Sequence, residues 1–235
     1  METAANLGSA VQAAIELDAP LNARLKLVAN AVRRFQPDRA AAVDRLVDRL
    51  LEQRVGSTAP KVGERLPDFL LPDDVGRLTP LQELLAHGPT VVSFQRGHWC
   101  PYCRTSAVSI AAVQDEIAAA GGRIVVIVPE RVEFALKLKQ SSGASFPILS
   151  DMDNGYALSL NLAVWVGQEM EGHMAEAGVD LPRFNGNQTW FLPVPAVFVV
   201  RPDGIVSARH VDPDYRRRME VDEMLEAVKS AKASH

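Results

Sequence analysis

Continuous runs of apolar residues indicate buried strands in the second half of the chain. Residues 90–94, 124–128 and 194–200 are such runs, and each is shorter than an ordinary helix. Residues 105–120, between the first two runs, have a helical pattern that ends at two glycines. Strand, helix and strand in succession predict a βαβ unit, whose parallel strands are buried on both faces.

The first 58 residues follow a different period. Apolar positions recur at three- and four-residue intervals between residues 8 and 54, and Pro20 and Pro37 divide them into about three helices. Residues 56–60 have the composition of a hinge. We therefore expect a helical extension over residues 1–58 and one α/β domain over residues 59–235. The extension either caps the domain or forms the interface of a homo-oligomer.

The rest of the α/β domain alternates between strand and helix patterns. Residues 163–190 fit no simple sheet, so we interpret them as an insertion, either a covering loop or a lid over the site described next. The other expected elements are a strand or hairpin at 62–76, a helix at 129–140, a short strand at 146–151, a returning strand at 205–210 and an amphipathic helix at 220–232.

The chain has two cysteines, Cys100 and Cys103, and they directly follow the first buried strand. This order places Cys100 in the turn after the strand and Cys103 in the first helical turn. Pro101 does not disturb the helix start, because the N–H group it lacks would be unpaired there. Backbone N–H groups and the positive end of the helix dipole favour the thiolate at both positions. The pair is expected to cycle between dithiol and disulfide.

Inert structural cysteines and half of a zinc site are the alternatives to redox chemistry. A structural zinc ion takes four ligands, and no second Cys-x-x-Cys or clustered histidines complete such a set. His98 is near the cysteines in sequence, while the other four histidines are scattered singly. We therefore expect neither a metal nor another cofactor.

Composition narrows the compartment and the partners. The 235 residues are 47% hydrophobic and 23% charged, with a formal net charge of -4. This balance gives no sign of a nucleic acid or an anionic membrane as partner. No basic residue precedes the short apolar stretch near the N-terminus, so we read no signal peptide there and expect a cytoplasmic protein. In the cytoplasm a lone cysteine pair is more often catalytic than structural.

Several spaced motifs from about residue 59 onward resemble the alkyl hydroperoxide reductase/thiol-specific antioxidant family, a peroxiredoxin-like branch of the thioredoxin-fold superfamily. The marks occur in the family's order. They are Gly63-x-x-x-Pro67-x-Phe69-x-Leu71, the strand that runs into Trp99-Cys100-Pro101, residues 146–151 (Phe-Pro-Ile-Leu-Ser-Asp), and the late hairpin around Pro202-Asp203-Gly204.

The resemblance implies a thioredoxin-like fold, which is a central mixed sheet flanked by helices, and a peroxidase reaction. The family cysteine that corresponds to Cys100 attacks a peroxide and becomes a sulfenic acid. A second thiol, for which Cys103 is the only candidate in this chain, condenses with it to a disulfide. A thioredoxin-type donor then restores the dithiol.

Two departures separate this chain from the family pattern. The family's Pro-x-x-x-Thr-x-x-Cys would require proline at Ser93 and threonine at Gly97, so the hydroxyl that orients the peroxide is missing. The family's arginine before the late strand falls near Pro195, so that cation is missing too. The substitutes for these donors that lie near the cysteines are Arg96, His98 and Arg104. Alternatively, these residues do not contact the peroxide, and the two arginines are solvated while the histidine faces water.

Three other residues near the predicted site are interpreted either as thioredoxin-like features or as structural residues. Thioredoxins have a proline, typically cis, facing their Cys-x-x-Cys, and Pro195 occupies the equivalent place. The resemblance therefore predicts a cis bond before it, although such bonds are usually trans. Trp99 before the first cysteine is also thioredoxin-like, or simple packing. Tyr102 is expected to shape the loop.

Three functions are compatible with these residues. The first is a peroxiredoxin-like thiol peroxidase acting on hydrogen peroxide or organic hydroperoxides, with Cys100 peroxidatic and Cys103 resolving. The second is a thiol–disulfide oxidoreductase acting on protein or small disulfides. The third is a redox sensor or binding module that the disulfide switches. The motifs at 63–71 and 146–151 favour the first; the missing threonine and arginine, with Pro195, favour the second.

Overall fold

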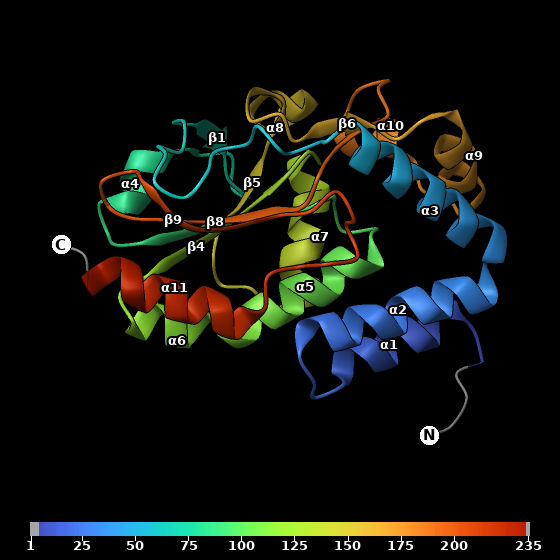
Figure 1. Cartoon of the computed structure of the whole chain (residues 1–235), viewed down its shortest axis with the longest axis horizontal. Helices are drawn as coiled ribbons and strands as arrows, with labels where there is room; N and C mark the ends of the chain where they lie inside the picture. The colour runs from blue at the N-terminus through green and yellow to red at the C-terminus, as the bar shows by residue number, and fades with distance from the viewer. Residues whose placement is uncertain (1–4, 234–235) are drawn as a thin grey trace.

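A mixed five-stranded sheet forms the centre of the molecule in the computed structural model, which describes residues 5–233 (Figure 1). The strand order is β5-β4-β3-β8-β9; β3, β4 and β5 are parallel, and β8 and β9 run antiparallel to their neighbours. This is the helix-flanked mixed sheet that the sequence predicts. The strands are β3 (Thr90–Phe94), β4 (Arg123–Val128), β5 (Ile148–Ser150), β8 (Ala196–Val200) and β9 (Val206–Val211).

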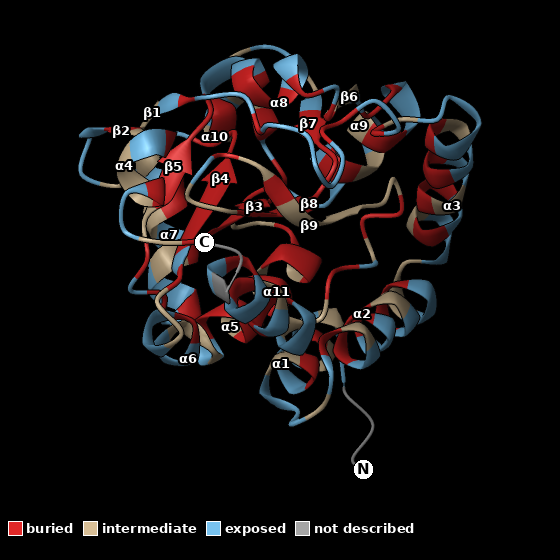
Figure 2. Cartoon of the chain, turned by 60° about the vertical axis from the view of Figure 1, so that its left-hand side comes forward, coloured by how far each residue is buried: buried red, intermediate tan, exposed pale blue. Residues whose placement is uncertain are grey.

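Alternate residues of the strands enter different cores. Val91 of β3 packs with four helices on one face, whereas Val92 packs under the β1–β2 hairpin and two short helices on the other face. Figure 2 shows the inner strands of the sheet buried, β9 at its edge largely intermediate, and the outer helix faces exposed. The first face has α5 (Pro101–Ala112), α6 (Gln114–Ala119), α7 (Val132–Ser142) and α11 (Val221–Ala233). The second has β1 (Leu70–Pro72), β2 (Leu78–Pro80), α4 (Leu81–Leu85), the 3-10 turn Met152–Asn154 and α8 (Gly155–Ser159).

The helix expected at residues 105–120 differs from the prediction at both ends and in the middle. It begins at Pro101 and is divided at Val113, whose φ of -107° and ψ of 8° leave the helical region. The Val113 N–H group donates to the Ile110 carbonyl three residues back, so the last turn of α5 is tightened before α6 begins. The longer α5 start brings Cys103 inside a regular helical turn.

Three helices precede the sheet: α1 (Leu7–Glu16), α2 (Leu21–Phe35) and α3 (Pro37–Glu52). Pro37 stands at the first position of α3, where proline is tolerated. In Figure 1, α1 and α2 lie beside α5, and α3 lies beside α9 (Gln168–Glu176). Their apolar faces share one buried cluster with both cysteines. The helical stretch is therefore present, and it packs on the cysteine side of the domain.

Residues 163–190 form their own small unit rather than an open loop. Strand β6 (Ala163–Trp165) pairs with β7 (Phe191–Pro193), and α9 and α10 (Leu181–Asn185) lie between them. Met170 and Met174 of α9 are buried in the cluster that contains the cysteines. The segment thus covers the cysteine side together with α3; that it is an insertion, and that residue 58 bounds a domain, stay predictions.

Hydrogen bonds over long sequence separations tie the N-terminal helices to the rest of the chain. The Glu220 carboxylate accepts from the N–H groups of Leu21 (2.8 Å) and Asn22 (2.9 Å) at the start of α2. Arg24 of α2 donates to the Ser109 hydroxyl on α5 at 2.7 Å. Among the described residues, no helix is both long and apolar enough to cross a membrane.

Candidate active site

The cysteines lie at the junction of β3 and α5, as the sequence predicts. Cys100 has extended backbone angles, φ -84° and ψ 118°, and its carbonyl accepts the Arg104 N–H group at 3.0 Å. Pro101 is the first helical residue and Cys103 follows in the same turn. Cys100 therefore occupies the N-cap position, next to the unpaired N–H groups and the positive end of the α5 dipole.

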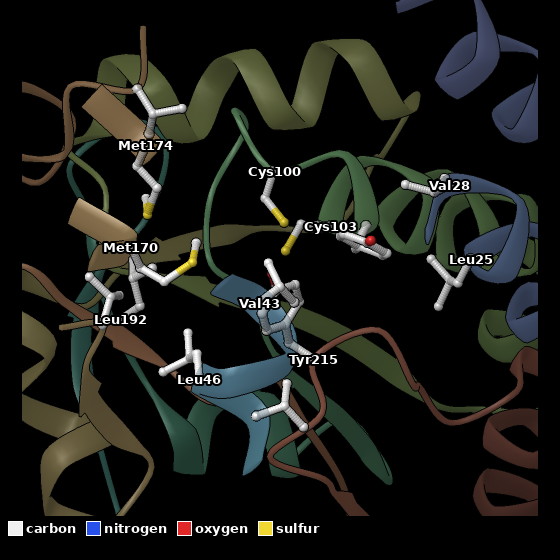
Figure 3. Packing of buried hydrophobic residues seen from close by; sticks show 14 of the residues in the cluster. Leu25, Val28, Val43, Leu46, Cys100, Cys103, Met170, Met174, Leu192 and Tyr215 are labelled. Carbon is white, nitrogen blue, oxygen red and sulfur yellow. The ribbon is translucent and has the colours of Figure 1, made fainter. Parts of the chain in front are cut away.

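Both thiols are free and almost fully buried. Cys100 is 1% exposed and Cys103 is 0% exposed. Figure 3 shows their sulfur atoms turned toward each other, with Met170 on one side and Val28 of α2 on the other. The Cys103 sulfur accepts the Arg96 backbone N–H group at 3.2 Å. This arrangement allows a local disulfide between residues three apart.

The two thiols differ in acidity. Burial opposes ionisation of Cys100, but a hydrogen bond from Cys103 and the charges on Arg96 and Arg218 outweigh it and lower the pKa of Cys100 to about 5. Burial raises the pKa of Cys103, and its hydrogen bond to Cys100 adds to the rise. The expectation of two favoured thiolates is therefore wrong for Cys103, because the inner thiol is the proton donor of the pair.

Two buried arginines face the pair without a carboxylate partner among the described residues. Arg96 is 4% exposed, and its guanidinium lies 3.9 Å from the ring centroid of Tyr215 and 5.1 Å from that of Trp99. Arg218 is 3% exposed, and its Nη2 lies 4.0 Å from the Cys103 sulfur. Their positive charge is left for the thiolate and adds to the hydrogen bond from Cys103 in lowering the pKa of Cys100.

Arg218 and Tyr215 are site residues that the sequence analysis missed. The N-terminal helices position Arg218: its N–H group donates to the Asn22 side-chain oxygen at 3.0 Å, and the Asn22 amide donates to the Arg218 carbonyl at 2.8 Å. Three arginines in succession at 216–218 look like a solvated run. The only local sign of a site here is that Tyr215 directly precedes the three arginines.

Gly97 explains why the family's threonine is absent. Its φ is +135°, and a Cβ atom there would lie 2.6 Å from the carboxyl carbon of Glu130 and 2.7 Å from the indole nitrogen of Trp99. A threonine would therefore be strained and would collide with both groups. The buried carboxylate of Glu130 lies where a Cβ atom of residue 97 would have to be.

His98 neither faces water nor stands free beside the thiolate. Its Nδ1 lies 2.6 Å from Glu130 Oε1, and its backbone N–H group donates to Glu130 Oε2 at 2.8 Å. The ring stacks on Phe134 at 5.3 Å and meets the edge of Phe184 at 4.9 Å. Glu130, which is fully buried and which the sequence analysis missed, thus fixes the loop before the cysteines.

The prediction of a cis bond before Pro195 is wrong. No cis peptide bond occurs among the described residues. The Val194 N–H group donates to the Leu162 carbonyl at 2.7 Å, and the chain passes from β7 into β8 through the usual trans bond. Pro195 is buried and lines a small cavity with Arg96 and Tyr215.

Cys100 opens to a cavity of about 280 Å³. Trp99, Pro101 and Tyr102 line this active-site pocket beside Cys100, as does Arg104, whose side chain has no hydrogen-bonding or charged partner among the described residues. Tyr102 meets the Tyr215 ring edge-on at 5.4 Å, so it shapes the pocket wall. No group of three metal-ligating side chains occurs in the described part of the chain.

Comparison with known proteins places the fold and the family. The AhpC/TSA family matches residues 62–209. Similar solved structures include the peroxidoxin BcpB from Mycobacterium tuberculosis, at 22% identity over 73% of this chain and 97% of that chain (TM-score 0.56). Another is peroxiredoxin 6 of Arenicola marina, at 18% identity over 74% of both chains (TM-score 0.57).

A third similar structure is AhpC from Mycobacterium tuberculosis, at 14% identity over 75% of this chain and 96% of that chain (TM-score 0.56). No curated protein sequence matches the chain significantly. The matched family segment contains both cysteines, but it ends before Tyr215 and Arg218 and begins after α3. The chain belongs to the AhpC/TSA family of thiol-dependent peroxidases.

Proposed function

We propose that this protein reduces hydroperoxides through Cys100, with Cys103 as the resolving thiol. The observation that carries the proposal is a buried thiol pair beside two guanidinium groups, Arg96 and Arg218, that have no carboxylate partner among the described residues. A thiolate is the nucleophile in such chemistry, and Cys100 with its pKa lowered to about 5 is ionised at neutral pH.

The reaction proceeds in two steps at the proposed site. The Cys100 thiolate attacks one oxygen of the hydroperoxide, the O–O bond breaks, and the leaving oxygen takes a proton to give an alcohol or water. Cys100 is then a sulfenic acid. The Cys103 sulfur attacks the Cys100 sulfur, its proton leaves with the hydroxyl group as water, and a disulfide forms. Arg96 and Arg218 stabilise the negative charge that develops on oxygen, a role the family gives to another arginine.

Reduction of the disulfide completes the cycle. A dithiol donor of the thioredoxin type supplies two electrons. Its thiolate attacks Cys100, because Cys100 lines the pocket whereas Cys103 is not part of its lining. The Cys103 thiolate leaves toward the Arg96 N–H group and the Arg218 guanidinium, which are within reach of its sulfur.

A thiol–disulfide oxidoreductase is the second candidate. The Cys-x-x-Cys pair at a helix start, with its first thiol acidic, favours it. The trans bond before Pro195 removes the strongest support for a thioredoxin-like peptide-binding edge. Peroxide reduction is therefore the better supported of the two.

Stopped-flow fluorescence of Trp99 tests the proposal, because this indole lies beside Cys100. The reduced protein is mixed with hydrogen peroxide, and a rate constant far above that of a free thiolate is expected. Trp99→Phe identifies the reporter signal, and Cys100→Ser abolishes the reaction. In Cys103→Ser, intact mass shows Cys100 as sulfenic acid or a higher oxide. A rate no better than a free thiol's, together with a trapped mixed disulfide in Cys103→Ser, assigns disulfide exchange instead.

A further inference from the structure

The active-site pocket is larger than hydrogen peroxide requires. Its volume is about 280 Å³, whereas one water molecule needs about 10–15 Å³ measured in the same way. Its walls are mainly apolar: Leu7, Val11, Val32, Val43, Met170 and Val179 line it. A pocket of this size and surface fits a substrate with an apolar body.

The apolar wall belongs to parts of the chain outside the family match or in the segment at 163–190. Leu7 and Val11 are on α1, Val43 is on α3, and Met170 is on α9. These helices share the core that contains the cysteines, so the wall is a built part of the fold. The family segment therefore supplies the nucleophile, and the N-terminal helices supply four of the six apolar wall residues, Leu7, Val11, Val32 and Val43.

Among the described residues, the charged ones that line the active-site pocket are all arginines. Arg39 and Arg104 line it in addition to Arg96, and none of the described lining residues is acidic. Arg39 donates to the Gln36 side-chain oxygen at 3.1 Å and has no carboxylate partner among the described residues. A half-buried arginine without an ion pair offers a fork of donors that suits a carboxylate.

Arg39 lies where the pocket meets the surface. Gln36, Arg39 and Ala177 line both the active-site pocket and an adjoining, more open depression between the start of α3 and the end of α9, and the lining of that depression also includes the acidic residues Asp38 and Glu176. Cys100, Arg96 and Tyr215 line the same pocket and are buried. The pocket therefore has the reactive thiol at its inner end, an apolar middle and a guanidinium at its mouth.

We propose that this pocket selects organic hydroperoxides with an apolar body and a terminal carboxylate, and that Arg39 is the specificity-determining residue that binds the carboxylate. The inference rests on the proposed peroxidase function. With the carboxylate at Arg39 and the apolar body along α1, α3 and α9, the hydroperoxide group reaches Cys100. Attack there gives the hydroxy acid and oxidised Cys100, with the same electron balance as for hydrogen peroxide.

The test compares three oxidants at neutral pH, below the concentration at which micelles form: hydrogen peroxide, a hydroperoxide of an unsaturated fatty acid, and its methyl ester. The measured quantity is the second-order rate constant of Cys100 oxidation. The acid-to-ester ratio is the rate constant for the fatty acid hydroperoxide divided by that for its methyl ester. A charge-assisted contact in a half-buried site predicts a ratio of about ten in the unmodified protein. The ester keeps the apolar body and the reacting group, so the ratio isolates the carboxylate.

Arg39→Gln is expected to reduce the acid-to-ester ratio to about one, because the fork of donors that binds the carboxylate is lost. Arg34→Gln is the matched control, because Arg34 is exposed on α2 and does not line the pocket. A ratio of one in the unmodified protein, or an unchanged ratio in Arg39→Gln, overturns the assignment while rapid reaction with hydrogen peroxide keeps the peroxidase function. If no oxidant reacts faster than with a free thiol, both proposals fall.

Discussion

Arg96 and Arg218 hold two positive charges against a thiol pair that is almost completely removed from solvent. An unpaired buried charge is costly, so each guanidinium gains from a thiolate nearby. Cys103 adds a hydrogen bond to Cys100 and keeps its own proton. The asymmetry divides the work between the thiols: the outer one is ready to attack, and the inner one attacks only after the outer one is oxidised.

The pH dependence of Cys100 follows from this arrangement. The pKa of Cys100 is lowered to about 5, whereas the pKa of an ordinary cysteine thiol is about 8.5. We expect thiolate absorbance and peroxide reactivity to rise with pH through about 5 and to be nearly constant above about 6.5, where more than nine-tenths is ionised. Below pH 5 the thiol is protonated and reactivity is lost. A rise centred between pH 8 and 9 would contradict the assignment.

Removal of the Arg218 charge tests the electrostatic cause of the low Cys100 pKa in the same titration. Arg218→Gln keeps a polar side chain, although a shorter one, and removes a charge that lowers the pKa of Cys100. The midpoint of the absorbance titration is expected to move to higher pH. Arg183→Gln is the control, because Arg183 is exposed on α10, and it should leave the midpoint in place.

The sequence predicts the nucleophile better than it predicts the nucleophile's surroundings. Cys100 and Cys103 follow a buried strand and open a helix, so local pattern alone places them. Arg218 and Glu130 reach the site through tertiary packing, and each looks locally like an ordinary surface charge. The wrong prediction of a cis bond before Pro195 has a similar cause, because the path of the chain through the β6–β7 pair decides the environment of this proline.

At the scale of elements, α2 depends on a residue from the other end of the chain. Its N-cap residue is Pro20, which makes no side-chain cap hydrogen bond. Glu220 supplies both carboxylate oxygens to the first N–H groups instead. The same turn contains Asn22, which binds the backbone of Arg218 on both sides. The start of α2 therefore stabilises a helix and positions a charge at the site.

Glu220→Gln tests this capping. The amide keeps one oxygen acceptor but loses the charge and turns an N–H donor toward the helix start, so the free energy of unfolding should fall by about 1–2 kcal/mol. Urea unfolding measures the change. Glu226→Gln is the control, since Glu226 makes an exposed pair with Lys229 and should change stability by less than about 0.5 kcal/mol. Equal effects of the two substitutions would contradict a capping role.

At the scale of the whole molecule, the N-terminal helices and the cysteine turn share one buried cluster rather than two separate cores. Leu25 and Val28 of α2 lie in it with Cys103, and so do Met170 and Met174 of α9 (Figure 3). A joint core couples the stability of the extension to the geometry of the thiols. We therefore expect the extension and the α/β domain to unfold in one transition.

Leu25→Ala measures this coupling. Leu25 is 0% exposed, so its truncation should cost about 2–5 kcal/mol and lower the midpoint of a single unfolding transition. Leu27→Ala on the same helix is the control, because Leu27 is 37% exposed and should cost less than about 1 kcal/mol. A separate early transition of the helices, with Cys100 still acidic, would show that the two parts are independent.

The link between Glu220 and the start of α2 has a consequence for the order of events during synthesis. The contact spans 199 residues, so it forms only after the chain through Glu220 has left the ribosome. Cys100 is translated and its strand can pair well before Arg218 exists. A nascent chain that lacks Arg218 therefore lacks one of the charges that lower the pKa of Cys100, and its thiol is less acidic than in the folded protein. Arrested chains that end before residue 218 should resist oxidation at concentrations that modify the released protein.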